Sequence, residues 1–128
     1  MILLLDTHLL LWAASQPERL SDVVREKLLD ENNDLWFSAA SLWEVTIKAG
    51  LGRPDFSVDP YLLRRGLVDN GYTELAISSQ HALAVRHLPP IHRDPFDRLL
   101  IAQAETEGIL LLTSDATVAS YPGPVELV

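Results

Sequence analysis

A chain of 128 residues and 14.3 kDa has the size of one domain. Its residues are 48% hydrophobic and 22% charged, a composition that excludes a disordered chain. The absence of cysteine excludes disulfides and thiolate metal sites and favours a cytoplasmic protein. No apolar run reaches the roughly 18 residues of a membrane span. The opening run 2–5 ends at Asp6 and lacks the basic region of a signal peptide, so we expect no membrane association.

The formal net charge of −8 at first argues against a nucleic-acid partner. That argument fails if several acids bind cations, because bound cations reverse the local field. Basic residues are concentrated in two stretches, which fit either a phosphate-facing patch or an ordinary solvated surface. They are Arg64 and Arg65, and then Arg86, His87, His92, Arg93 and Arg98.

Short apolar runs alternate with segments of helical pattern along the chain. The predicted strands are 2–5, 35–37, 72–77 and 109–112, with a fifth near 125–128. The predicted helices are 8–14, 21–32, 41–49, 60–70, 78–87 and a last one opened by Asp94 and Pro95 and stopped by Gly108. Alternating strands and helices predict a single α/β domain over residues 1–128, with a parallel sheet of four to five strands.

Four acidic residues follow or precede these strands in a consistent way. Asp6 comes directly after the first strand, and Asp115 comes just past the strand 109–112. Glu44 and Asp97 lie in the first turns of two helices. Because parallel strands end at one edge of a sheet, the four carboxylates are expected to converge there. Clustered carboxylates repel unless a hard cation is bound, and oxygen ligands favour Mg²⁺ or Mn²⁺ over zinc.

Each of these acids also has a purely structural interpretation. Asp6 fits the N-cap of the first helix, and Asp94 fits that of the helix carrying Asp97. Ser41 and Glu44 fit a capping box in which the helix begins after Ser41. The segment 113–115 fits a simple turn. Singly these interpretations are as good as the metal site, and only the joint placement of the acids favours the site.

The blocks that carry these acids resemble, in order, the successive motifs of PIN-domain nucleases, and among them the VapC toxins. The blocks are Leu3-Leu4-Leu5-Asp6-Thr7, Ser38-Ala39-Ala40-Ser41-Leu42-Trp43-Glu44, Asp94-Pro95-Phe96-Asp97-Arg98-Leu99-Leu100-Ile101-Ala102-Gln103-Ala104 and Leu112-Thr113-Ser114-Asp115. The likeness covers nearly the whole chain, and the third block is the most specific. Ser114 departs from the pattern, since relatives often carry Arg before the fourth acid.

The resemblance implies a Rossmann-like fold and a metal-dependent ribonuclease. It makes Asp6, Glu44 and Asp97 the core acids and Asp115 the fourth, all as catalytic metal ligands, with Asp94 supporting them. It further implies Mg²⁺ or Mn²⁺, an RNA substrate, a cognate antitoxin and a homodimer or higher oligomer. The run 9–12, which is all leucine and tryptophan, is expected to need cover from such partners.

Three other functions compete with the toxin. A PIN-type nuclease of RNA processing has the same acids, and a binding module has an acidic pocket without catalysis. A phosphotransfer receiver domain also gathers aspartates, but no Lys follows a late strand here in the required place. His8 is a candidate ligand or phosphate donor, although a lone histidine is more often neither. Trp12, Trp36 and Trp43 are candidates for base stacking, with core or interface packing as the main alternative.

Overall fold

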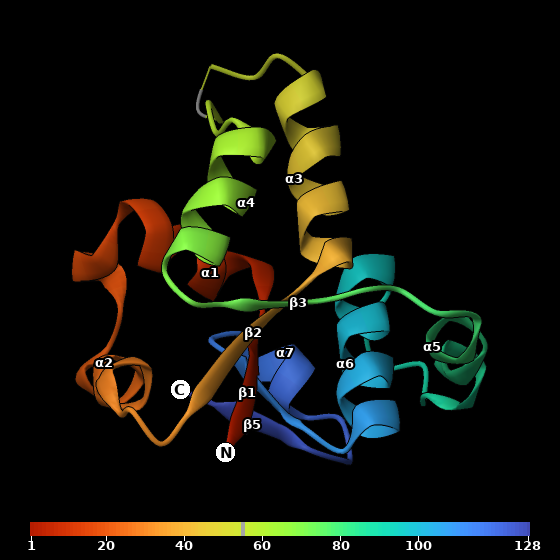
Figure 1. Ribbon diagram of the computed structural model, residues 1–128. Coiled ribbons are helices and arrows are strands. Elements are labelled where there is room, and N and C mark those ends of the chain that lie inside the picture. Colours follow the sequence, from red (N-terminus) through yellow and green to blue (C-terminus); the bar gives the residue numbers. More distant parts are fainter. Residues whose placement is uncertain (55) are drawn as a thin grey trace.

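The computed structural model describes residues 1–54 and 56–128. Its centre is a parallel sheet with the strand order β3-β2-β1-β4-β5 (Figure 1). The strands are β1 (Ile2–Leu5), β2 (Asp34–Ser38), β3 (Thr73–Leu75), β4 (Leu110–Thr113) and β5 (Val125–Leu127). The α/β class and the five-stranded parallel sheet expected from the sequence are confirmed.

Helices connect successive strands and lie on both faces of the sheet. They are α1 (Thr7–Ser15), α2 (Asp22–Leu29), α3 (Ala39–Gly50), α4 (Pro60–Asp69), α5 (Ser79–Ala84), α6 (Pro95–Glu107) and α7 (Ala116–Ala119), with 3₁₀ turns η1 (Pro17–Arg19) and η2 (Val85–His87). Helices α3 and α4 stand side by side and project beyond the sheet edge (Figure 1).

Two apolar layers separate the helices from the sheet because alternate residues of a strand point to opposite faces. Leu3 and Leu5 of β1 pack with α1, α2 and α4, while Leu4 packs with α6 and α7. All three leucines are fully buried, as expected for a central strand covered on both faces. The chain leaves β1 in one direction through β2 and β3 and then returns to the other side as β4, so the topology reverses between β1 and β4.

Several helix boundaries lie where the sequence predicts them, because a nearby side chain caps the first turn of the helix. Ser21, Asp59 and Asp94 accept hydrogen bonds from the first turns of α2, α4 and α6. Gly108 ends α6 with a positive φ of 68°, a conformation that favours glycine.

Other boundaries were predicted wrongly. Helix α2 ends at Leu29 and not at residue 32, and β3 is shorter than the predicted strand 72–77. The capping box at Ser41 is also wrong, because β2 runs directly into α3 and Ser38 is the cap. The short helix α7 was not expected at all.

The expectation that the run 9–12 needs an external cover is wrong for its first half. Leu9 and Leu10 are each 1% exposed and belong to the apolar layer between α1 and the sheet. Trp12 and Trp36 are half-buried against the two layers, whereas Trp43 is 56% exposed. Within the described parts of the chain, no helix combines the length and apolarity that crossing a membrane requires.

Candidate active site

The point at which the strand order reverses places Asp6 and the end of β4 next to each other. Asp6 is 4% exposed and caps α1 by accepting a hydrogen bond from the amide of Leu9 at 2.9 Å. Its other oxygen, Oδ2, accepts a hydrogen bond of 2.6 Å from the hydroxyl of Thr113. Thr113 Oγ1 in turn accepts a hydrogen bond from the amide of Asp115. Open parallel sheets bind ligands at such a reversal, so the location matches a functional site.

Glu44 reaches the site from α3. Since Ser38 caps this helix by accepting from the amide of Ala40, Glu44 lies in the second turn and not at a capping position. The side chain is buried, and Lys48 Nζ lies 2.8 Å from Glu44 Oε2. The other oxygen, Oε1, is buried and has no hydrogen-bond partner among the described residues. A buried carboxylate oxygen without a partner is costly, which makes Oε1 a free ligand atom.

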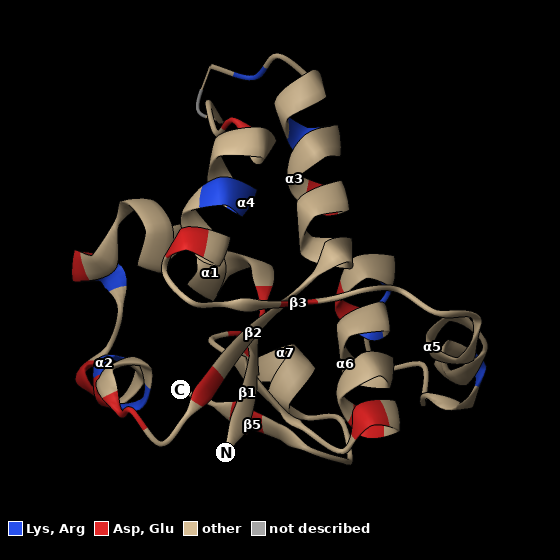
Figure 2. Cartoon of the chain, viewed as in Figure 1, with Lys and Arg blue, Asp and Glu red and all other residues tan. Residues whose placement is uncertain are grey.

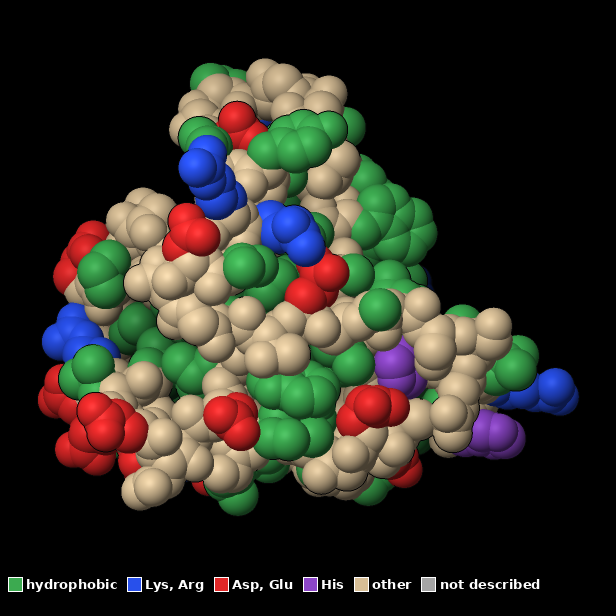
Figure 3. Space-filling view, in the orientation of Figure 1, with side chains coloured by type: hydrophobic (Ala, Val, Ile, Leu, Met, Phe, Trp, Pro, Cys, Tyr) green, Lys and Arg blue, Asp and Glu red, His purple; other side chains and the backbone are tan. Residues whose placement is uncertain are grey.

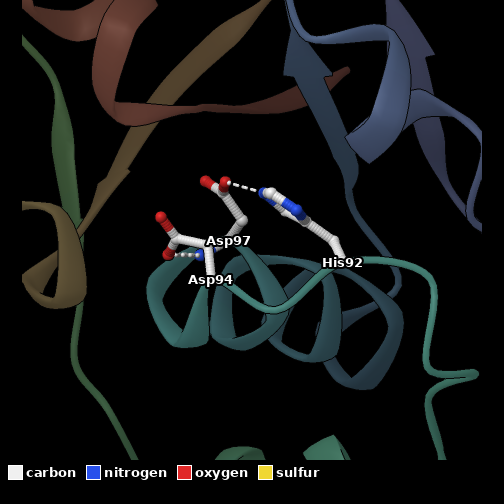
Figure 4. A group of neighbouring side chains, drawn as sticks. All are labelled: His92, Asp94 and Asp97. Atoms are coloured by element: carbon white, nitrogen blue, oxygen red, sulfur yellow. Dashed lines mark hydrogen bonds and ion pairs between the residues drawn. The ribbon is translucent and has the colours of Figure 1, made fainter.

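Asp97 lies in the first turn of α6 and has a histidine partner. Asp94 caps the helix through hydrogen bonds from the amides of Phe96 and Asp97 at 2.8 and 3.1 Å. His92 folds back from the preceding segment, and its Nε2 lies 2.9 Å from Asp97 Oδ2 (Figure 4). One ligand atom from each of His92, Asp94 and Asp97 lies within 4.8 Å of the others. Three such groups at this spacing are able to hold a metal ion.

Helices α3 and α6 are joined beside the site by packing and by a buried polar network. The rings of Trp43 and Phe96 meet edge to face with centroids 5.2 Å apart. Ser38 donates to Gln103 Oε1, and the side-chain nitrogen of Gln103 lies 3.3 Å from His81 Nδ1. Fully paired buried networks define one arrangement of the elements that they join. The relative position of Glu44 and Asp97 therefore depends on these contacts.

Burial raises the pKa of two of these carboxyls, and repulsion from other acids adds to the effect at one of them. Burial raises the pKa of Asp6 above its ordinary value, although the hydrogen bonds that it accepts lower it in part. Burial also raises the pKa of Asp97 to about 6, and the charges of Asp94 and Glu44 add to that increase against the opposing effect of His92. The influence of Glu44 on Asp97 indicates that α3 and α6 direct their acids into one electrostatic environment. Such an environment favours a bound cation.

The four predicted acids are connected in two pairs. Asp6 and Asp115 are linked through Thr113, and the charge of Glu44 acts on Asp97. In the chain as described, the group at the start of α6 is the only set of three metal-ligating side chains within 4.8 Å, and of the four it contains Asp97 alone. Glu44 acts on this group from α3 through its charge, while Asp6 lies at the end of β1. Asp115 Oδ1 caps α7 by accepting from the amide of Thr117 at 2.8 Å. Asp6 and Asp94 therefore cap their helices as the structural interpretation predicted, whereas the capping box at Glu44 is absent because Ser38 caps α3.

The basic run expected between residues 86 and 98 is not a phosphate-facing patch as a whole. The guanidinium of Arg98 turns inward and donates to the carbonyls of Pro89 and Val85 at 2.9 and 3.2 Å. It also donates to the hydroxyl of Tyr121 at 3.1 Å. Arg98 therefore attaches the segment before α6 to that helix.

Three partners of the acids were not identified from the sequence. Lys48 was detectable, since it lies four residues after Glu44 on one helical face. Thr113 stood within a recognised block without an assigned role. His92 had no usable signal, because its position depends on an irregular segment that folds back on α6.

The raised pKa of Asp97 leads to a pH dependence of stability in the metal-free protein. Between its ordinary pKa and about 6, the native state binds more protons than the unfolded state, so stability falls as the pH rises through this window. A difference of about two pKa units corresponds to roughly 3 kcal/mol as an upper value. Urea unfolding with EDTA from pH 4 to 7.5 measures the decrease. Asp97→Asn cannot titrate and should remove this part of it, and an unchanged pH profile would contradict the assignment.

A divalent metal fits the residues present. The donor set consists of carboxylates and one imidazole, which suit Mg²⁺ or Mn²⁺ at the carboxylates. Glu44 Oε1, which has no partner within residues 1–54 and 56–128, is an available ligand atom.

The fold and the site together define a parallel α/β domain with an acidic centre where its strand order reverses. The family model of the PIN domain matches residues 3–123, and the chain belongs to this family. Over 121 residues it is 28% identical to Ribonuclease VapC22 of Mycobacterium tuberculosis. The aligned residues cover 94% of this chain and 92% of that protein.

Two solved structures share this fold. VapBC2 from Rickettsia felis, bound to a DNA fragment from its promoter, matches with a TM-score of 0.73 and 18% identity over 99% of this chain and 98% of that one. DNA-bound VapBC from Salmonella typhimurium matches with a TM-score of 0.68 and 18% identity over 98% and 97%.

Proposed function

We propose that the protein is a metal-dependent endoribonuclease and the toxin of a toxin–antitoxin pair. One observation carries the catalytic part of the proposal: each of the three core acids has a side-chain partner from another position of the chain that holds one of its oxygens. Thr113 donates to Asp6, Lys48 to Glu44 and His92 lies against Asp97. Partners of this kind orient metal ligands. The likeness to Ribonuclease VapC22 supports RNA as the substrate.

The acids Asp6, Glu44 and Asp97, with Asp115 as a fourth, would hold Mg²⁺ or Mn²⁺. When bound, the metal lowers the pKa of a water molecule and offsets the charge that develops on the phosphate. The chain's own groups position the ligands: the α1 cap holds Asp6 at the end of β1, and the α6 cap holds the backbone of Asp97. His92 limits the rotation of the Asp97 carboxylate, because it holds Oδ2 at 2.9 Å.

An exposed apolar surface supports a protein partner. Tyr61 and Leu62 of α4 are 86% and 65% exposed, and Trp43 and Leu51, in and directly after α3, are each 56% exposed. Figure 3 shows hydrophobic side chains gathered over this pair of helices. Apolar surface of this kind is typical of interaction sites. The VapBC names of the structural neighbours support an antitoxin as one occupant. A second copy of the chain is the other occupant that we propose. The same proposal places the protein in the cytoplasm, where RNA is available.

Expression of the chain alone is expected to stop bacterial growth and degrade RNA. Co-expression with the small protein encoded beside it should restore growth, and the two proteins should co-purify. The measurements are colony counts and the integrity of total RNA on a gel. A harmless chain that cuts no RNA would refute the toxin.

Glu44→Gln provides the matched control, since it removes a core charge while keeping the size of the side chain. This variant should be harmless alone and still co-purify with the partner, because Glu44 is buried and not part of the exposed surface. A variant as toxic as the parent would favour a non-catalytic binding module. A chain that cuts RNA but has no partner would favour the RNA-processing nuclease.

A further inference from the structure

A basic groove lies on the α1 side of the acidic site. Its cavity of about 660 Å³ is within the roughly 300–1,000 Å³ of ligand-binding clefts. It is enclosed by α1, α3 and the segments that follow each of them. The residues that matter here are Thr7, His8, Trp12, Arg19, Lys48 and Arg53.

The described residues that line this groove carry a charge opposite to that of the whole protein. The chain carries a formal net charge of −8 and only ten Lys and Arg residues. Three of the ten, Arg19, Lys48 and Arg53, line this groove, and none of its lining residues in the described ranges is acidic. Basic segments on α3 and in the segment after it are visible in Figure 2. Such segregation of charge in a hollow attracts anions and concentrates their field.

The groove adjoins the acidic site through two of its lining residues, Thr7 and Lys48. Thr7 directly follows Asp6, and its hydroxyl donates to Ser41 Oγ at 2.9 Å. Lys48 lies in the groove while its Nζ holds Glu44 Oε2 at 2.8 Å. An anion bound at the acids through a metal ion would therefore continue into a positively charged channel.

The lining offers both charge and flat surfaces. The guanidinium of Arg19 lies 5.5 Å from the ring centroid of Trp12, and the His8 ring lies 6.1 Å from the same tryptophan. Arg53 and Phe56 face the groove from the opposite segment. Arginine forks bind phosphate, and aromatic or guanidinium planes stack on bases without selecting their sequence.

We infer that this groove binds single-stranded RNA on one side of the phosphate to be cut, with Arg19 and Arg53 as phosphate contacts. The inference rests on the proposed ribonuclease function and adds the path of its substrate. An RNA strand fits better than an acidic peptide, since its phosphates recur at every nucleotide and carry bases for Trp12 and Phe56. The same path supplies a reason for a nuclease of net charge −8 to bind RNA at all.

The test measures binding of a fluorescein-labelled single-stranded RNA dodecamer by anisotropy, with EDTA present, so that binding does not depend on cleavage. The parent protein carries Asp97→Asn to prevent cutting. The groove variant adds Arg19→Ala and Arg53→Ala. The control variant adds Arg65→Ala and Arg86→Ala instead, which removes the same charge from exposed arginines outside the groove.

We expect the groove variant to bind RNA at least about tenfold more weakly, whereas the control changes less than twofold. Because each phosphate contact contributes about 0.7 to the salt slope of single strands, the slope should fall by about 1.4 in the groove variant alone. Equal weakening in both variants, or none in either, would overturn the inference. A poly-glutamate peptide that binds as tightly and competes with the RNA would also overturn it, in favour of a protein ligand.

The two proposals fail in different ways. If the wild-type protein binds RNA through Arg19 and Arg53 but never cuts it, the groove proposal stands and the ribonuclease proposal fails. If the wild-type protein cuts RNA and the groove variant binds RNA as tightly as its parent, the ribonuclease proposal stands and the groove proposal fails. If the alanine variant is unfolded by circular dichroism, Arg19→Gln with Arg53→Gln is used in its place, and both arginines are exposed enough to accept it.

Discussion

Replacing Asp97 by asparagine should reduce Mg²⁺-dependent RNA cleavage by at least about 100-fold while the protein remains folded. Asn keeps the size of the side chain and an oxygen for His92, but it removes the charge that would hold the cation. Loss of several kcal/mol of metal-derived stabilisation corresponds to this factor. The measurement is the initial rate of cleavage of a labelled RNA with saturating metal, together with the melting temperature.

The matched control for this result is Asp59→Asn. Asp59 caps α4 through hydrogen bonds to the amides of Tyr61 and Leu62 and lies outside the site. Asparagine caps helices about as well as aspartate, so both the activity and the fold should be retained. Full activity of the Asp97→Asn protein would contradict the assignment of Asp97 as a metal ligand. The Asp97 charge would then only stabilise the N-terminus of α6.

Addition of millimolar Mg²⁺ or Mn²⁺ should raise the melting temperature by several degrees. A metal at 100 times its dissociation constant stabilises the native state by about 2.7 kcal/mol through mass action. Here it would also relieve the repulsion that adds to the effect of burial on the pKa of Asp97, and it would pair Glu44 Oε1, which no described residue contacts by a hydrogen bond. Differential scanning fluorimetry with and without EDTA measures the shift.

Asp6→Asn should remove most of this shift, since Asp6 is a predicted ligand whose cap on α1 asparagine can maintain. NaCl of equal ionic strength is the control for general screening of charge. An equal shift in the wild type and in Asp6→Asn, or an equal shift with NaCl, would show that the cations act on the net charge and not at the site.

Much of the fold was predictable because short-range chemistry determines it. The run 2–5 has the composition of a strand buried on both faces, and β1 is such a strand. Ser21, Asp59 and Asp94 cap their helices through bonds to residues two or three positions away, so their role is visible in the sequence. The order of strands and helices was enough to predict a parallel sheet. The same order predicted the edge where Asp6 and Asp115 follow their strands.

The start of α3 was not predictable in this way, since two serines compete for it. Ser38 and Ser41 both stand before helical residues, and the local sequence favours Ser41 because Glu44 follows three residues later. Ser38 becomes the cap because its hydroxyl also donates to Gln103 of α6 in the folded chain. That contact spans 65 residues of sequence. With Ser38 as the cap, Glu44 is free to pair with Lys48 and to direct Oε1 into the interior.

What the sequence alone determined was therefore the type of most elements and the sheet edge at which Asp6 and Asp115 follow their strands. Tertiary structure alone decided how Asp6 and Asp97 are partnered. His92 contacts Asp97 because an irregular segment folds back on α6. Thr113 at the end of β4 donates to Asp6 at the end of β1, and the two residues are 107 positions apart in the sequence. The basic groove likewise brings Arg19 together with Lys48 and Arg53 only after α1 and α3 have packed. Helix and strand signals depend on neighbours within a few residues, whereas hydrogen bonds and charges act between whichever groups the fold brings into contact.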